Sequence, residues 1–353
     1  RRHCPTNDST EKGGFDVVGS SNTLWALSKL KQKPIERDSE PGPLLDQAIV
    51  ALSRRVVDLA PGFNCQDLAT ALQGFADMAI ARSFIYAPAL MDRIIERADD
   101  FKAREAVNIL ASFARSRAGD KLQSHMTSLE SAHPPLHVLS ALVAQLRSHK
   151  LSSRDVATTI WALGRLDHLA SMVDHTVPLL RLVEGQACFL NAQDMSNVFV
   201  GLGTCFATHQ HHHRTAAAAA SNPLLPQKIL PATSTTTTSS TSTTNGGVLA
   251  CDDKATLDAL LSVLGKLQSA VPALAPRLTP QHTANIHWAL SNLATAVPLM
   301  KVDPVCLKEL RQRCLDVASE LEPQHVANLA YALTKLHHHH HSNNGGGGGH
   351  RPP

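Results

Sequence analysis

The sequence predicts an all-α protein: a solenoid of about seven helical hairpins, for which a right-handed superhelix is expected. The first observation is a repeated phrase, since TPQHTANIHWALSNL at residues 279–293 returns as EPQHVANLAYALTKL at residues 322–336. The second is that the same pattern fits five further segments at intervals of 38 to 50 residues, apart from one gap of 88 residues that contains a low-complexity insert. A period near 40 is typical of helical repeats. The third is that residues favouring helix starts stand at the beginning of the copies.

Each copy has a central position, numbered zero, which holds Trp288 in the copy at residues 279–293. The seven centres are Trp25, Gln73, Ala111, Trp161, Val200, Trp288 and Tyr331. Position +1 holds Ala, Gly or Ser in every copy, and position +2 holds Leu or Phe. This regularity indicates one helical unit that recurs along the chain.

Residues at the start of the copies are typical of helix N-termini. Position −9 holds residues whose side chains accept hydrogen bonds from first-turn amides, namely Asp16, Asn64, Ser152, Asn191 and Thr279. Acidic residues suited to a capping box follow at the third helical position in four copies: Asp67, Glu105, Asp155 and Asp194. We therefore expect helices at residues 16–30, 64–78, 102–116, 152–166, 191–205, 279–293 and 322–336.

Apolar residues at helical spacing between the copies predict a partner helix for each hairpin. We expect partner helices near residues 44–59, 88–98, 136–147 and 177–183, and a short extra helix near residues 121–129. The segment from Lys254 onward fits either another partner helix or a degenerate eighth copy.

Composition separates the repeats from three low-complexity segments. Residues 1–15 are polar, residues 206–253 contain His, Ala, Ser and Thr runs, and residues 337–353 are rich in His and Gly. We expect these segments to be disordered because they bury too little apolar surface to offset the entropy of ordering. Five copies then occupy residues 16–205, and residues 254–336 hold two copies together with the segment that fits either a partner helix or a degenerate copy. The start at Arg1 without Met suggests a fragment that lacks any targeting peptide.

Composition and motifs argue against several classes of function. With 353 residues, 43% of them hydrophobic, the chain is ordinary for a globular protein, and its net charge of +3 permits an anionic partner. No uninterrupted apolar run reaches about 18 residues, so no membrane span is predicted. Seven cysteines without a CxxC pair predict free thiols. Phosphate-binding loops, nucleophile elbows and zinc-protease motifs are absent, so we expect no enzyme, cofactor or metal site.

Positions −7, −3, 0 and +4 fall on one side of each predicted helix, because successive residues turn by about 100°. Positions −5, −2, −1, +2 and +5 fall on another, mostly apolar side, which we expect to form the core. Small residues at −4, +1 and +3 would let neighbouring helices approach closely. The first set, which we call the stripe, combines Asn, Thr, Gln and Arg with aromatic rings and basic residues, as an RNA-reading surface requires.

The candidate RNA-binding residues of the stripe are Asn22, Trp25, Lys29, Gln66, Thr70, Arg104, Asn108, Arg115, Arg154, Thr158, Trp161, Arg165, Gln193, Asn197, Gln281, Asn285, Trp288, Gln324, Asn328, Tyr331 and Lys335. Structural interpretations of the same residues remain open. The Asn and Thr side chains would bond a neighbouring helix, the rings would pack between repeats, and the basic residues would lie on a solvated face. His282 and His325, at the third helical position, are interpreted as closing the first turn rather than as catalysts.

Four phrases resemble the octotricopeptide repeat family, whose helical-hairpin proteins are related to FAST-kinase-like proteins. They are SNTLWALSKL at 21–30, VATTIWALGRL at 156–166, TANIHWALSNL at 283–293 and VANLAYALTKL at 326–336. The resemblance implies binding of single-stranded organellar mRNA or rRNA, alongside other RNA-processing proteins, in RNA processing, stability or translation. It favours the chloroplast over the mitochondrion, and the homopolymer runs are similar to green-algal coding sequence.

The copies centred on Gln73, Ala111 and Val200 depart from this family because they lack the aromatic residue, and no RAP-type module is recognisable. The alternative hypothesis is a protein-binding scaffold of the armadillo or HEAT type. Such a scaffold would have the same helices, with a peptide or protein in place of RNA.

Overall fold

The computed structural model describes residues 16–31, 43–80, 82–116, 134–169, 172–205, 254–297 and 299–344. Every regular element within these ranges is a helix, which confirms the all-α prediction. The predicted disorder of residues 1–15 and 206–253, and the extra helix near residues 121–129, lie outside the described residues. The chain divides into two compact units, Arg1–His168 and Leu169–Pro353. The division therefore falls between the fourth and fifth copies.

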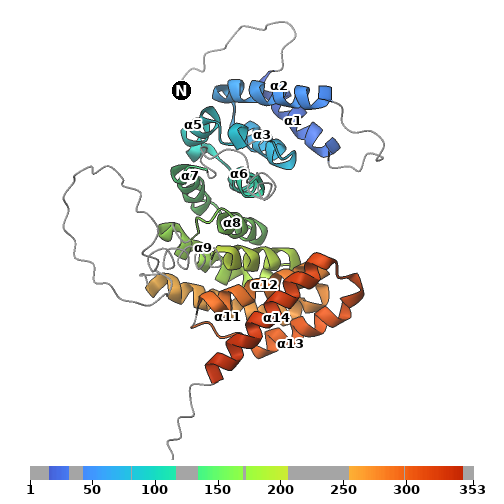
Figure 1. Cartoon of the computed structure of the whole chain (residues 1–353). Coiled ribbons are helices and arrows are strands. Elements are labelled where there is room, and N and C mark those ends of the chain that lie inside the picture. The colour runs from blue at the N-terminus through green and yellow to red at the C-terminus, as the bar shows by residue number, and fades with distance from the viewer. Residues whose placement is uncertain are drawn as a thin grey trace, which may run out of the picture. The chain divides into compact units, whose positions relative to one another are not determined.

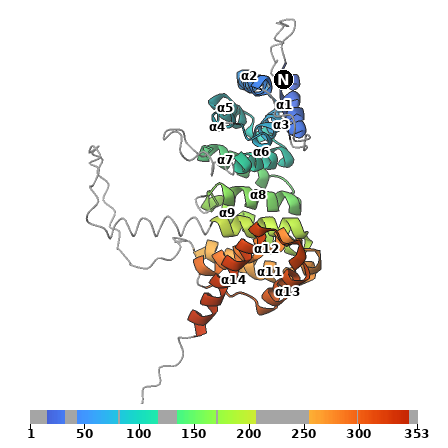
Figure 2. The same cartoon turned by 45° about the vertical axis from the view of Figure 1, so that its right-hand side comes forward.

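The first unit is organised around motif helices, by which we mean helices that carry a copy of the repeated pattern. These are α1 (Val17–Lys31), α3 (Cys65–Asp77), α6 (Ala103–Ser116) and α8 (Ser153–Arg165). Each packs against the next in that order (Figures 1 and 2). The partner helices are α2 (Pro43–Leu59), α4 (Arg82–Ile85), α5 (Pro88–Glu96) and α7 (Leu136–Arg147). Among them, α2 packs against α1, and α7 packs against α6.

The second unit repeats this arrangement. Its motif helices are residues 192–205, α12 (Pro280–Ala296) and α14 (Pro323–Asn344). Its partner helices are α9 (Val173–Gln186), α11 (Lys254–Leu274) and α13 (Pro304–Asp316). Helix α12 packs against α14, while α11 packs against both α9 and α13 (Figure 1). Because its neighbours are partner helices, α11 fits the partner-helix interpretation better than that of a degenerate copy.

The predicted helix starts agree with the structure at the level of individual hydrogen bonds. Capping boxes form between Asn64 and Asp67, between Ser152 and Asp155, and between Thr279 and His282. The Nδ1 atom of His325 likewise accepts a hydrogen bond from the backbone N–H of Glu322, at 3.1 Å. Both recurrent histidines therefore close the first turn of their helices, as the sequence predicts.

Two helices differ clearly from their predicted bounds, and one short helix was not predicted. Helix α9 starts at Val173 rather than near residue 177, so that Pro178 lies inside it, one turn from its start. Helix α14 continues through the histidine run to Asn344, although the tail was expected from residue 337. Histidine is tolerated in a helix, whereas each glycine of the run that follows costs about 1 kcal/mol. The single turn α4 was not predicted, because four residues carry no detectable period.

A feature that the sequence analysis missed precedes most motif helices. The 3₁₀ turns η1 (Ala60–Gly62), η2 (Ala98–Asp100), η4 (Ala187–Phe189), η5 (Ala275–Arg277) and η6 (Ala318–Glu320) each end eleven residues before a centre. The next residue, at position −10, is extended and apolar: Phe63, Phe101, Leu190, Leu278 and Leu321. An apolar residue just before a helix cap can pack onto the helix as a hydrophobic staple, which fixes the angle of entry.

Small residues allow close contact between motif helices, as predicted. A Cβ atom added to Gly203 would lie 2.8 Å from the Cα and Cβ atoms of Ala289 in α12. A Cβ atom on Gly74 would lie 3.1 Å from Cγ of Leu24 and 3.2 Å from the backbone nitrogen of Trp25. Distances below 3.4 Å are tighter than ordinary contacts, so larger side chains at these two positions would push the helices apart.

The sequence predicts no membrane span, but one helix of the structure is long and apolar enough to be a candidate. By length and composition alone, Lys254–Arg277 meets that requirement, with a mean hydropathy of 1.2. A single such helix is weak evidence, because the core helix of a soluble protein passes the same test. The buried residues Leu260, Leu264 and Leu267 lie on α11, which packs against α9 and α13.

His287, at position −1 of α12, is a buried polar residue where the other copies carry Leu, Ile, Phe or Ala. Its Nδ1 atom lies 2.9 Å from the carbonyl oxygen of Thr283, and its buried Nε2 atom has no hydrogen-bond partner among the described residues. Burial lowers the pKa of His287 below the usual 6.5, because the charged ring would lose its hydration. The unfolded chain therefore takes up a proton near pH 6.5, whereas the folded chain does so only at lower pH.

We predict that this difference makes the second unit less stable as the pH falls below about 6.5 and that the loss levels off below the folded pKa. His287→Leu should reduce the pH dependence and add about 1 kcal/mol at neutral pH, because an unpaired buried polar group is removed. Urea unfolding between about pH 5 and pH 7.5 measures both effects. His137→Gln, at an exposed position of α7, is the control. An unchanged pH profile for His287→Leu would refute the prediction.

Candidate nucleic-acid interface

The stripe residues at −7 and −3 lie on an accessible side of the motif helices. At −7 the side chains are exposed: Gln66, Arg104, Arg154, Gln193, Gln281 and Gln324. At −3, Asn22 is exposed and the others are half-buried: Thr70, Asn108, Thr158, Asn197, Asn285 and Asn328. The core positions of α3 are buried, as Leu68, Leu72 and Phe75 show, whereas α14 exposes Val326 and Leu333 at core positions −5 and +2. The angular sorting of the sequence thus separates the accessible side from the core.

The aromatic residues at the centres are not enclosed between repeats. Trp25 is 42% exposed and Tyr331 is 46% exposed, while Trp161 and Trp288 are half-buried. At the centres without a ring, Gln73 and Val200 are half-buried and Ala111 is buried. The accessible rings do not fit the interpretation that these residues serve only for packing.

Three of these rings carry a basic side chain from one turn further along the same helix. The cation lies 5.8 Å from the ring centroid for Lys29 and Trp25, and 5.6 Å for Arg165 and Trp161. For Lys335 and Tyr331 this distance is 4.6 Å. Cation–π contacts at accessible sites contribute about 0.5–1 kcal/mol. These three copies therefore combine a flat surface with a positive charge at one place on the helix.

Amide groups at −7 and −3 pair along the helix in two copies, and one of them also reaches a neighbouring motif helix. Gln193 Oε1 lies 3.0 Å from Nε2 of His282 in α12. Gln193 Nε2 donates to Asn197 Oδ1 at 2.9 Å, and Gln324 Nε2 donates to Asn328 Oδ1 at 3.0 Å. In the part of the chain that the structure describes, no side chain at −3 forms a hydrogen bond to a neighbouring motif helix. The interpretation of the Asn and Thr ladder as a structural bond between helices is therefore unsupported.

The basic residues at +4 make contacts that the sequence analysis did not foresee. Lys29 Nζ in α1 lies 2.8 Å from Asp77 Oδ2 in α3, and Arg115 Nε in α6 lies 3.4 Å from Asp77 Oδ1. Lys335 Nζ in α14 lies 3.1 Å from Oδ1 of the buried Asn292 in α12. Each of these three cations therefore has the +4 residue of an adjacent motif helix as a partner in the RNA-free chain.

Asp77 and Asn292 could have been found in the sequence, because they occupy position +4 of their own copies. The acid and the amide stand in line with the basic residues of the other copies, and this alignment is the sequence signal for a polar contact between neighbouring motif helices. Burial also lowers the pKa of Arg115, and the nearby Asp77 carboxylate partly offsets that effect. Position +4 is therefore a place where motif helices of one unit interact through polar side chains.

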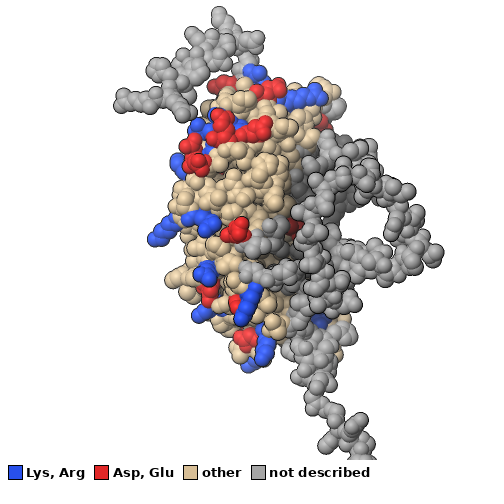
Figure 3. Space-filling view, turned by 90° about the vertical axis from the view of Figure 1, so that its left-hand side faces the viewer, with Lys and Arg blue, Asp and Glu red and all other residues tan. Residues whose placement is uncertain are grey.

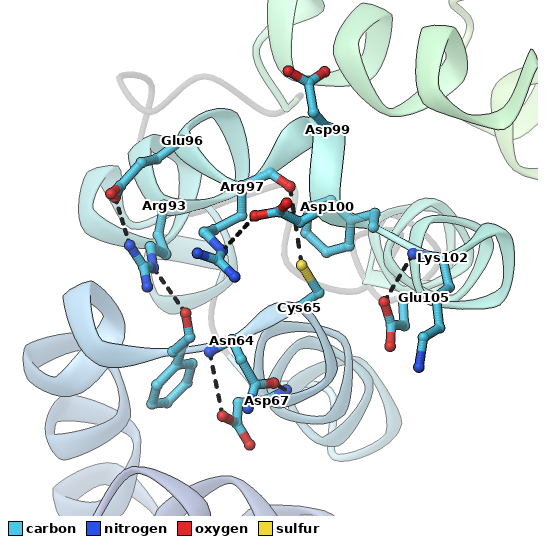
Figure 4. A network of polar contacts seen from close by, with 12 residues as sticks. Asn64, Cys65, Asp67, Arg93, Glu96, Arg97, Asp99, Asp100, Lys102 and Glu105 are labelled. Atoms are coloured by element: carbon cyan, nitrogen blue, oxygen red, sulfur yellow. Dashed lines mark hydrogen bonds and ion pairs between the residues drawn. The ribbon is translucent and has the colours of Figure 1, made fainter. Parts of the chain in front are cut away.

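Polar contacts away from the stripe hold the turns that lead into the motif helices (Figure 4). Arg93 in α5 donates from Nε to the carbonyl oxygen of Phe63 at 2.8 Å and bonds Glu96 at 2.7 Å. In the second unit, Arg313 in α13 makes the matching bond to the carbonyl oxygen of Leu278, also at 2.8 Å. These arginines have structural partners, so they add no evidence for an anion site.

Where described residues are visible in Figure 3, basic and acidic groups lie near one another and form no continuous basic surface. Within the described residues, no group of three or more His, Cys, Asp or Glu side chains is placed to hold a metal ion. Burial raises the pKa of Cys306 to about 12 and that of Cys314 to about 11, so both thiols stay protonated at neutral pH. The stripe therefore remains the main candidate for a functional surface.

No family model and no curated protein matches this chain. The resemblance to octotricopeptide repeats thus rests on the repeated phrases, and the candidate site rests on the geometry of the stripe.

Proposed function

We propose that this protein binds single-stranded RNA along the stripe of its motif helices and that it acts without catalysis. The observation that carries the proposal is the accessibility of the rings at position 0, with hydrogen-bonding side chains at −3 and −7 on the same side. Base stacking on an aromatic ring contributes about 1–3 kcal/mol per base and suits every base. Packing alone would not require these rings to be exposed.

In this proposal each complete copy contributes one set of contacts. A base stacks on the ring, amide or hydroxyl groups at −3 and −7 bond the edge of a base, and a cation lies near a phosphate. The Gln193–Asn197 and Gln324–Asn328 pairs support this role, because the bonded amides are already oriented along the helix. The copies centred on Gln73, Ala111 and Val200 provide no ring and therefore no stacking surface.

We further propose that the helical hairpins form a solenoid of about seven repeats with a right-handed superhelix. Two observations support it: the 3₁₀ turns stand at the same distance before five centres, and the motif helices pack in chain order within each unit. The resemblance to octotricopeptide repeats supports an organellar RNA as the partner, in processing, stability or translation. It also supports the chloroplast as the location.

A protein-binding scaffold of the armadillo or HEAT type is the second candidate, and one observation favours it. Helix α14 exposes apolar side chains, with Val326 51% exposed and Leu333 40% exposed. Apolar groups of this kind suit a protein partner better than a nucleic acid. Capture of proteins without any binding of RNA would support the scaffold instead.

Substitution of Asn108 and Asn285 by alanine tests the RNA proposal. The double variant should bind a random-sequence single-stranded RNA pool about ten-fold more weakly, because each lost hydrogen bond contributes about 0.5–1.5 kcal/mol. The melting temperature of the double variant should equal that of wild type, since neither side chain bonds another helix in the described structure. Fluorescence anisotropy and thermal melting provide the two measurements.

Asn64→Ala is the matched control, because Asn64 caps α3 by accepting from the backbone N–H of Asp67 at 3.0 Å. It should cost about 1 kcal/mol of stability and leave RNA affinity unchanged. The proposal fails if the chain binds no RNA at low salt. The assignment of position −3 fails if the Asn108 and Asn285 variant is destabilised as much as the capping variant.

A further inference from the structure

Asp77 is unusual among the residues at position +4. The seven copies carry Lys29, Asp77, Arg115, Arg165, Thr204, Asn292 and Lys335 there, so Asp77 is the one acid in a series of basic or neutral residues. It lies on α3, between two motif helices that carry a cation at the same position, α1 and α6. Both cations turn toward its carboxylate, Lys29 at 2.8 Å and Arg115 at 3.4 Å.

The side chain of Asp77 is much less exposed than those of Lys29 and Arg115. The Asp77 side chain is only 9% exposed, whereas the side chains of Lys29 and Arg115 are each 38% exposed. The cations thus cover the carboxylate and still present part of their surface to solvent. An anion that approaches from solvent meets the cations first, so the carboxylate competes with it for them.

Stability alone gives a weak reason for this arrangement, because partly exposed ion pairs contribute little to folding. The stripe gives a stronger one. Lys29 also lies over the ring of Trp25, and Arg115 follows Asn108 along one side of α6, so both cations border candidate contacts for bases. A carboxylate that holds two cations in such a place has the charge of a phosphate diester.

We propose that the carboxylate of Asp77 mimics an RNA phosphate within the protein. In the RNA-free protein it holds Lys29 and Arg115 in position, and in the complex it competes with a backbone phosphate for them. This inference rests on the proposed RNA-binding function and adds to it a residue that limits affinity. It assigns to Asp77 a role opposite to that of the other stripe residues, because its charge weakens the binding of RNA.

Removal of the charge has two measurable consequences. The three side chains sum to one positive charge with aspartate and to two with asparagine, so Asp77→Asn should bind RNA about five-fold more tightly at low salt. Two freed cations also add phosphate contacts. The log–log slope of affinity against salt should therefore steepen by up to about 1.4, at about 0.7 for each contact with a single strand.

The experiment compares full-length wild type, Asp77→Asn and Asp92→Asn by fluorescence anisotropy with a random-sequence single-stranded RNA pool, from about 50 to 300 mM salt. Asp92→Asn is the matched control, because Asp92 is an exposed acid on α5 in the same unit and its loss changes the net charge equally. Lys29→Gln in the Asp77→Asn background should remove about half of the gain in slope. Thermal melting of each variant reports folding.

The outcomes separate this inference from the proposed function. If wild type binds RNA and Asp77→Asn changes affinity and slope no more than Asp92→Asn, the inference is wrong and RNA binding stands. Weaker binding by a folded Asp77→Asn variant also overturns it, and shows that the carboxylate only positions the cations. Should Asp77→Asn fail to fold, Asp77→Thr serves instead, since Thr204 occupies this position in another copy. Absence of RNA binding by wild type at low salt overturns both proposals.

Discussion

Replacement of both Trp161 and Trp288 by alanine is expected to lower RNA affinity by at least about 30-fold, the largest effect on binding that the proposed function predicts. Each ring supplies one stacking surface, which contributes about 1–3 kcal/mol per base, so two rings contribute about 2 kcal/mol or more. Both rings are half-buried, on α8 and α12 respectively, and keep part of their surface accessible. Anisotropy with a random-sequence single-stranded RNA pool measures the loss.

Two controls decide whether stacking is the cause. Alanine at the half-buried centres Gln73 and Val200 removes side chains from the same position without removing a ring, and RNA affinity should change little. Phenylalanine at Trp161 and Trp288 keeps a flat ring and should retain most of the affinity. If the alanine pair binds RNA as wild type does but melts at a much lower temperature, the rings serve packing, and their assignment to RNA is wrong.

Local signals account for most of what the sequence predicts correctly about the fold. The starts of α3 and α12 follow from Asn64 and Thr279, because a capping side chain acts on amides only three residues away. The bond from Arg93 to the Phe63 carbonyl joins residues 30 apart, and no local pattern indicates it. The 3₁₀ turns were missed for a related reason, since three residues are too few to show a period.

In the candidate site, too, local signals predict which side of a helix a residue lies on, but they do not predict its contacts with other helices. Helical geometry alone sorts Asn285 and Trp288 onto the accessible side and Leu290 into the core, because only the angle per residue matters. The partner of Lys29 lies 48 residues away on another helix, and its identity depends on how neighbouring helices align. Alignment of the copies places Lys29, Asp77 and Arg115 at one position, but their contacts require the packing of α1, α3 and α6.

Leu290→Ala and Leu333→Ala should differ sharply in their effect on stability, although the sequence places both residues at the same core position, +2. Leu290 is fully buried in α12, which contacts residue Gly203 of the preceding motif helix and packs against α14. Truncation of Leu290 should cost about 2–5 kcal/mol and unfold the second unit at lower urea concentration.

Leu333 in α14 is 40% exposed, because within the described residues no further motif helix covers that side. Its truncation should cost less than about 1 kcal/mol. Equal losses in urea unfolding of the full chain would mean that the accessible side of α14 is covered in solution.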